Sequence, residues 1–185
     1  ELEEPVYPDY RPVPDLFVDV APAHPVRSVV DLGGPEGGSL VERREAPYRL
    51  AADFPAVDPR RSGGATDRFW MLAISATGKR GRKFLDRLVS VDLAEGAEVD
   101  AWQAPQKRYL GGEPVFLGPH AGSTPEAAAE DGPEALIAVQ ELDADARSSA
   151  FLLFDAWDLA RGPVARLPLR SPVPPLVHAC YTPEP

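Results

Sequence analysis

The chain has 185 residues, of which 44% are hydrophobic, and this is enough for one domain with a sizeable core. Its formal net charge of -10 excludes nucleic acid as a partner and disfavours docking on anionic lipid, because an acidic surface repels phosphate. The single cysteine excludes an internal disulfide and predicts a reducing, cytoplasmic location.

The 22 prolines and 15 glycines predict many short strands joined by turns, since both residues punctuate strands and break helices. No apolar run reaches the length of a membrane span, and no signal peptide is expected at the start. The chain begins with Glu1 and not with methionine. We therefore expect either a processed protein or a piece of a longer one.

Residues 1–26 are expected to form an irregular, Pro-rich connection with one short strand near residues 16–20 and His24 in a solvated loop. Residues 27–185 are expected to form the folded domain. In it, residues 27–32 and 39–44 are apolar-containing runs joined by G-G-P-E-G-G, which predicts a hairpin. A phosphate-binding loop is excluded there, because no helix pattern follows the glycines.

Residues 52–61 are predicted to be extended at Asp53, which precedes Phe-Pro, and to turn at Asp58-Pro59. Residues 69–76 form the first strongly apolar run and predict a buried strand. The basic stretch 79–83 is interpreted as a solvated loop rather than an anion site. Residues 88–93 and 97–103 alternate around a turn and predict a hairpin.

Further strands are predicted at residues 109–117, 135–142, 150–155 and 164–169, and around His178, with an acidic loop at 120–131 and a tight turn at 158–163. About ten short strands with almost no helix indicate an all-β sandwich, barrel or propeller. Residues 88–103 and 151–169 resemble each other as hairpins, which is typical of propeller blades.

The segment 171–181 holds the most informative polar residue. His178 follows a Pro-rich approach and lies among Val177, Ala179 and Cys180, so it is expected to be either a buried neutral histidine or a metal ligand. On a strand, Cys180 would share its face and could form a nucleophilic pair, but nothing nearby orients the imidazole, and we interpret Cys180 as structural.

Two carboxylates accompany this histidine. Asp53 lies before a proline, and Glu113 lies between a glycine pair and an apolar run. Each alone is most simply a solvated carboxylate. A paired-carboxylate glycosidase stays open, but no pair of acids is marked out among the 29.

Several runs, in this order, resemble the C-terminal part of the carotenoid cleavage oxygenases, a family that includes apocarotenoid and stilbene oxygenases and the retinal pigment epithelium isomerase. The runs are D-F-P-A-V-D-P-R-R, V-D-L, G-G-E-P-V-F, E-D-G, F-L-L-F-D-A-W-D-L-A-R-G-P-V-A-R-L-P-L and P-x-x-H. The resemblance covers residues 27–181.

The resemblance implies the C-terminal blades of a seven-bladed β-propeller with a non-haem Fe(II) on its axis, bound by four histidines. It implies oxidative cleavage of a conjugated carbon–carbon double bond by O2, with an apolar polyene or stilbene-like substrate. His178 matches the last iron-binding histidine. Glu113 and Asp53 match carboxylates that accept the other ring N–H of ligand histidines, although Asp53 is one methylene shorter than the usual glutamate. Ala179 replaces the usual glycine.

The other three ligands would lie upstream of Glu1, because His24 and His120 match none of them. The chain is thus expected to be the C-terminal third to two-fifths of an oxygenase and inactive alone. The alternative is a truncated, metal-free propeller fragment that acts as a binding or scaffolding module. The sequence decides neither the substrate, the oligomeric state nor membrane contact of the intact protein.

Overall fold

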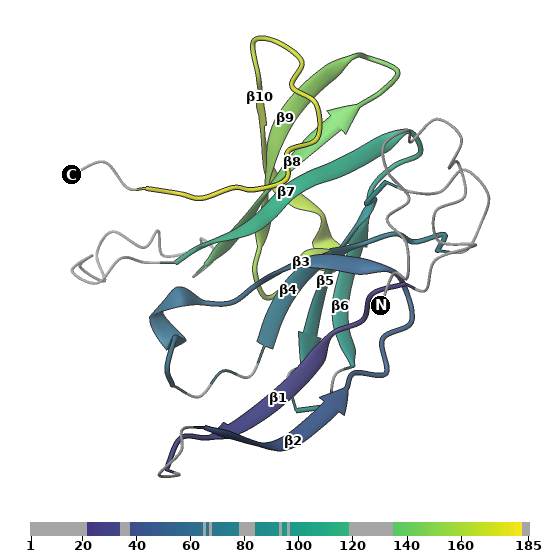
Figure 1. Cartoon of the computed structure of the whole chain (residues 1–185). Coiled ribbons are helices and arrows are strands. Elements are labelled where there is room, and N and C mark those ends of the chain that lie inside the picture. The colour runs from purple at the N-terminus through teal and green to yellow at the C-terminus, as the bar shows by residue number, and fades with distance from the viewer. Residues whose placement is uncertain are drawn as a thin grey trace.

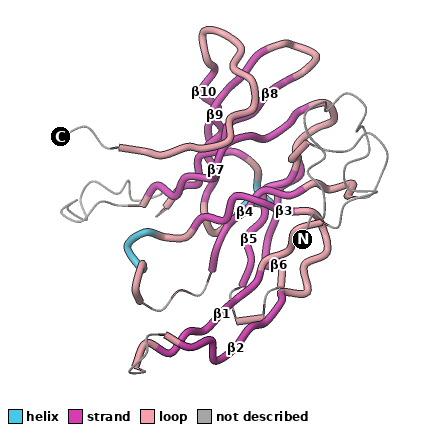
Figure 2. The backbone as a smooth tube through the Cα atoms, viewed as in Figure 1, coloured by secondary structure: helices cyan, strands magenta, loops and turns pink. Residues whose placement is uncertain are grey.

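The computed structural model describes residues 22–33, 38–64, 66, 68–77, 84–92, 94–95, 97–118 and 135–182. In these residues, ten strands form three antiparallel sheets (Figure 1, Figure 2). The strands are β1 Val26–Asp31, β2 Ser39–Glu45, β3 Ala52–Ala56, β4 Arg68–Ala73, β5 Arg87–Asp92, β6 Glu98–Gln103, β7 Arg108–Leu117, β8 Leu136–Asp143, β9 Ser148–Asp155 and β10 Pro163–Pro168. Two short 3-10 turns are Pro59–Arg61 and Leu159–Arg161. No helix in this part of the chain is long and apolar enough to cross a membrane.

The two larger sheets have the same simple topology. One has the order β3-β4-β5-β6 and the other β7-β8-β9-β10, so each strand pairs with the next in the chain. The first strands of the two sheets, β3 and β7, contact each other. The hairpins at 88–103 and 151–169, which resemble each other in sequence, supply the third and fourth strands of their sheets. Their equivalent places explain the repeated pattern.

The main core lies between these two sheets. Trp70 and Leu72 on one face of β4 belong to one buried cluster with Phe154 of β9, and the Trp70 indole donates a 2.9 Å hydrogen bond to the Ala156 carbonyl. Phe69 and Met71 on the other face of β4 belong to a second cluster. Both faces of β4 are therefore buried, which is why its sequence is a continuous apolar run. Each large apolar side chain buried in this way contributes about 1.5–3 kcal/mol.

Asp100 of β6 connects the two sheets through polar contacts. One of its carboxylate oxygens accepts the backbone N–H groups of Leu159 and, at 3.3 Å, Ala160, which lie after β9. Beside it, the rings of Trp102 and Phe154 pack with their centroids 5.0 Å apart. The carboxylate thus satisfies amides at the start of a 3-10 turn that have no partner within the turn.

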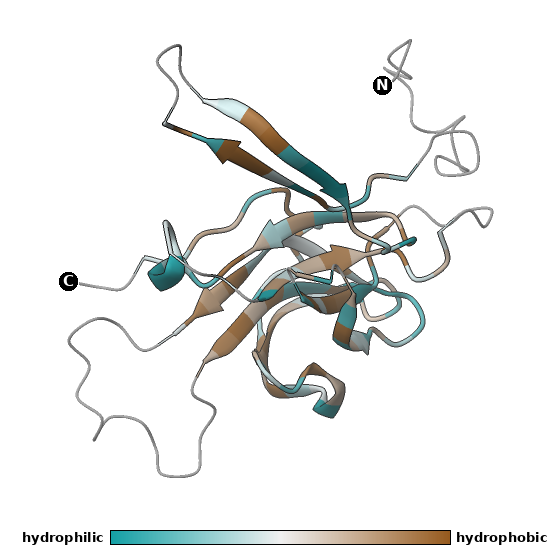
Figure 3. Cartoon of the chain, turned by 90° about the horizontal axis from the view of Figure 1, so that it is seen from below, coloured by the Kyte–Doolittle hydropathy of each residue, from teal (hydrophilic) through white to brown (hydrophobic). Residues whose placement is uncertain are grey.

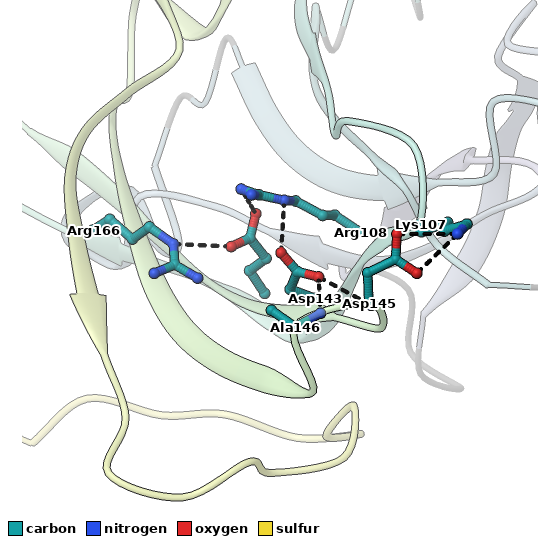
Figure 4. A network of polar contacts seen from close by, with 7 residues as sticks. Lys107, Arg108, Asp143, Asp145, Ala146 and Arg166 are labelled. Atoms are coloured by element: carbon teal, nitrogen blue, oxygen red, sulfur yellow. Dashed lines mark hydrogen bonds and ion pairs between the residues drawn. The ribbon is translucent and has the colours of Figure 1, made fainter.

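A charged network lies at one end of the second sheet (Figure 4). The Glu141 side chain is only 1% exposed and accepts from Arg166 at 3.1 Å and from Arg108 at 3.4 Å. Arg108 also contacts Asp143 at 3.2 Å, and Asp143 accepts the Ala146 backbone N–H at 2.8 Å. This backbone hydrogen bond and the charges of the two arginines lower the pKa of Asp143.

The hairpin of β1 and β2 confirms the interpretation of the G-G-P-E-G-G linker. It extends away from both larger sheets (Figure 3). Its apolar side chains Val30, Leu40 and Val41 are 49%, 59% and 66% exposed. In the described structure the hairpin therefore contributes little to the core.

One strand was not predicted, and one predicted strand is absent from the described residues. Asp53 is extended and the chain turns at Asp58-Pro59, as expected, but residues 52–56 also form a strand, because β3 pairs with β4 from Ala52 to Ala56. Conversely, residues 169–182, which were predicted to include a strand around His178, form none. Their prolines lack the N–H groups that a β-ladder requires. The predicted strand at 16–20, the basic stretch 79–83, the acidic loop 120–131 and His120 lie outside the described residues.

Candidate functional site

The segment after β10, residues 171–182, lies against the strands of the second sheet and carries His178. It is held by two buried polar side chains, Gln140 of β8 and Ser149 of β9. It also contacts β7 directly, because the Gly112 backbone N–H donates to the Leu176 carbonyl at 2.6 Å. The segment is thus attached to three strands without joining the ladder.

The glycine pair of β7 makes this close approach feasible. The register of β7 with β8 shifts between Gly111 and Val115, which is a bulge, and Gly112 has a φ of 71°. A Cβ on Gly111 would lie 2.8 Å from the Cα and Cβ of Pro175. Glycine at 111 therefore leaves room for the segment, and glycine at 112 adopts the left-handed backbone of the bulge without strain.

The bulge presents Glu113 to the segment. One Glu113 carboxylate oxygen is 3.0 Å from Nδ1 of His178, and the other accepts the Ala179 backbone N–H at 3.2 Å. The hydrogen bonds from His178 and then from Ala179 lower the pKa of Glu113. Because an ionised carboxylate only accepts, His178 donates from Nδ1, and its Nε2 is left with a free lone pair when the ring is neutral.

The exposure of His178 corrects one expectation. We expected little contact with water, but 80% of the imidazole surface is exposed, against 38% for Glu113. The side chain therefore points out of the described structure rather than into its core. Cys180 is exposed, and its interpretation as a structural residue stays a prediction.

Asp53 occupies a comparable place in the other sheet. It lies in β3 at a register shift between Asp53 and Ala56, and its exposed carboxylate accepts the Phe54 backbone N–H at 2.8 Å. Phe54 has a φ of 59°. Within the described residues, no hydrogen bond connects Asp53 to a histidine. Its predicted role toward a ligand histidine stays a prediction.

His24 differs from the solvated loop residue that we expected. It is half-buried, and its Nδ1 is buried with no hydrogen-bond partner among the described residues. It lines a cavity of about 410 Å³ together with Asp53, Phe69 and Met71. This cavity lies over the face of the first sheet that is turned away from the second sheet.

The side chains that hold the His178 segment were not predicted from the sequence. Gln140 and Ser149 are 2% and 1% exposed. The only signal for Gln140 was a polar residue within the apolar run 135–142. Such a residue must find hydrogen-bond partners when buried, but the sequence does not indicate which ones.

The donor set fits one ligand of a metal site. A histidine that donates one ring N–H to a carboxylate and exposes its other nitrogen has the arrangement of metal-binding histidines in proteins. No group of three or more histidine, cysteine, aspartate or glutamate side chains that could hold a metal occurs among the described residues. His178 can therefore supply one ligand, and the others would have to come from elsewhere.

Comparisons with known proteins place this geometry in context. Residues 7–183 match the sequence model of the family described as retinal pigment epithelial membrane protein. A comparison with curated proteins found no match. Among solved structures, a mutant of Synechocystis apocarotenoid oxygenase is similar, with 24% identity and a TM-score of 0.65, over 88% of this chain and 30% of that one.

Two further solved structures agree with this. Cobalt-substituted Synechocystis apocarotenoid oxygenase has 23% identity and a TM-score of 0.64, over 86% of this chain and 30% of that one. A chimera of apocarotenoid oxygenase and RPE65 has 23% identity and a TM-score of 0.66, over 88% and 31%. The chain thus spans about 30% of the length of these structures. The predicted fold class, an all-β part of a β-propeller, is confirmed.

Proposed function

This chain belongs to the retinal pigment epithelial membrane protein family, and on that premise we propose that it is the C-terminal part of a non-haem Fe(II) dioxygenase. The substrate class is an apolar polyene, an apocarotenoid or a stilbene-like molecule with a conjugated double bond. When bound, the iron would supply the site where O2 is activated for cleavage of that bond into two carbonyl products. One observation carries the proposal, namely the hydrogen bond between His178 and Glu113 in a chain of this family.

The residues of this chain have separate tasks in this proposal. His178 would bind the iron through Nε2 as a neutral ligand, which leaves the charge of the metal uncancelled. Glu113 keeps the proton of His178 on Nδ1 and orients the ring. The same carboxylate holds the backbone after His178 through the Ala179 N–H, so that the ring and its backbone are fixed together.

The described residues supply only one of the ligands that a metal site of this kind requires. The resemblance assigns the others to three histidines of the intact protein. Asp53 would accept a hydrogen bond from one of those histidines, as the match of D-F-P to the family pattern suggests. His178 would thus complete a site that is built mainly by other blades.

The test uses the intact protein that contains this chain, purified without metal and reconstituted with Fe(II). Iron content, O2 consumption and carbonyl products are measured with an apocarotenoid and a stilbene. His178→Ala should lose the iron and the activity. Glu113→Gln should lower metal affinity by about 10–100-fold, because it replaces the charged acceptor. Cys180→Ser, an exposed neighbour on the same segment, is the matched control and should change neither.

Retention of iron and turnover by His178→Ala would exclude His178 as a ligand. Failure of the intact wild-type protein to bind Fe(II) would overturn the dioxygenase proposal as a whole. In that case the metal-free scaffolding module would become the better description.

A further inference from the structure

The backbone of the segment before His178 has few groups that can hold it in place. In residues 172–176, P-V-P-P-L, only Val173 and Leu176 carry a backbone N–H, because the other three residues are prolines. The segment therefore cannot join a β-ladder through regular hydrogen bonds. Whatever positions it must use those two N–H groups and the carbonyls beside them.

Buried side chains accept hydrogen bonds from both of these N–H groups. The Leu176 N–H donates to Oε1 of Gln140 at 2.9 Å, and the Val173 N–H donates to Oγ of Ser149 at 2.9 Å. The same two side chains also contact the carbonyls: Nε2 of Gln140 donates to Pro174 at 3.0 Å, and Oγ of Ser149 is 2.8 Å from the carbonyl of Val173.

The Gln140 side-chain amide thus accepts a hydrogen bond through its oxygen and donates through its nitrogen. Its Nε2 has a second carbonyl, that of Val173, at 3.2 Å. Gln140 is 2% exposed, and Ser149 is 1% exposed. Buried groups whose hydrogen bonds are all made to one segment rigidify that segment, because any displacement leaves them unsatisfied. Their neighbouring places on β8 and β9 give the segment two separate attachment points.

We propose that Gln140, together with Ser149, is a positioning residue for His178. The two side chains fix residues 173–176 on the sheet, so that two residues later the His178 ring meets Glu113. The consequence for metal affinity rests on the proposed function, whereas the positioning itself does not. Gly112 continues the attachment at Leu176, and Glu113 completes it at Ala179.

The Ala179 amide gives a readout that is independent of metal and of activity. Because this N–H donates to Glu113, its hydrogen exchange reports whether the segment is seated where His178 meets the carboxylate. Exchange is measured in the intact, metal-free protein. The affinity for Co(II), which serves as an oxygen-stable probe ion, is measured in parallel by competition with a chelator.

The test variants are Gln140→Met, which keeps the length but removes the amide, and Ser149→Ala, a milder change if the first does not fold. Two matched controls are available. Gln103→Met removes an amide that donates to the Asp86 carbonyl beside the other sheet. Ser90→Ala removes a fully buried hydroxyl that has no hydrogen-bond partner in the described part of the chain.

Gln140→Met should speed exchange at Ala179 by about tenfold or more, since it breaks several hydrogen bonds of the segment. It should also weaken Co(II) binding by about 10–100-fold. The controls should change neither quantity. Unchanged exchange at Ala179 in both Gln140→Met and Ser149→Ala would overturn the inference, as would equal effects in the controls. If the wild type binds no Co(II), the proposed function fails, and exchange at Ala179 still decides the positioning role.

Discussion

Substitution of Gly111 by alanine tests the close contact between β7 and the His178 segment. The new Cβ would lie 2.8 Å from two carbon atoms of Pro175 and 3.0 Å from the Leu176 nitrogen. Because carbon atoms pack at about 3.5–4.0 Å, the segment would have to move by about 0.7 Å or more. A movement of that size away from β8 would stretch the 2.9 Å hydrogen bond between Leu176 and Gln140 to about 3.6 Å, beyond a useful length.

We expect Gly111→Ala to cost about 1–3 kcal/mol, as overpacking of a tight contact does, and the cost should be local to the segment. The assay is hydrogen exchange at Leu176 and Ala179 combined with urea unfolding of the intact protein. Gly112→Ala is the control at the next residue. Its Cβ would meet Ala179 at an ordinary 3.5 Å, and the φ of 71° should cost about 1–2 kcal/mol without displacing the segment.

This reasoning would be refuted if Gly112→Ala speeds hydrogen exchange at the Ala179 amide as much as Gly111→Ala does. The backbone of the bulge, and not the space above Gly111, would then control the segment. Gly111→Ala with unaltered exchange at Leu176 would also contradict it, because the overlap would have been relieved elsewhere.

Three other predictions concern charged groups. Glu141→Gln should lower the free energy of unfolding by about 2 kcal/mol in urea titrations. This is less than a fully buried ion pair would lose, because the Arg108 and Arg166 side chains are 36% and 38% exposed. An unchanged unfolding midpoint would contradict this expectation. The Glu113 contacts lower its pKa from 4.5, so their contribution should be complete above pH 4.5 and disappear as the pH falls through the lowered pKa. Exchange at the Ala179 amide, corrected for its intrinsic pH dependence, should show this loss, and Glu113→Gln should abolish the pH dependence. Asp100→Ala should cost about 1 kcal/mol by urea unfolding through loss of its contacts with the Leu159 and Ala160 amides. Asp100→Asn keeps one oxygen for these two amides but loses the contact of the other oxygen with the Ala101 N–H, so it should retain part of that stability; a loss equal to that of Asp100→Ala would argue against the capping role.

Most strands were predictable, because local patterns express their environment. Residues 69–74 of the predicted run 69–76 are buried, with β4 ending at Ala73, and the alternating runs at 88–93 and 97–103 form a hairpin. The strand β3 was not predictable. Four of its five residues, the two alanines, the aspartate and the proline, have low strand propensity, and pairing with β4 makes the run a strand. The error around His178 has the opposite cause, since an apolar run suggested a strand that its preceding prolines cannot support.

Glu113 and His178 were named from the sequence as site residues, which stays a prediction, and the contacts around them could not be derived from it. The resemblance of two short motifs marked Glu113 and His178, and the structure brings the two side chains to 3.0 Å. The resemblance could not indicate that Gln140 and Ser149 hold the segment, because neither residue belongs to a motif. The interpretation of His24 as solvated failed for a related reason: its environment depends on strands remote in the chain.

The sequence by itself determined what each residue's backbone can do. Prolines at 172, 174 and 175 have no N–H to donate, and a glycine at 112 can adopt a positive φ. Only the tertiary structure decided which groups meet, because Glu113 and His178 are 65 residues apart and their contact requires β7, β8 and β9 to be paired first. A hydrogen bond depends on placement within a few tenths of an ångström, and that placement is a property of the assembled sheet rather than of any local run of residues.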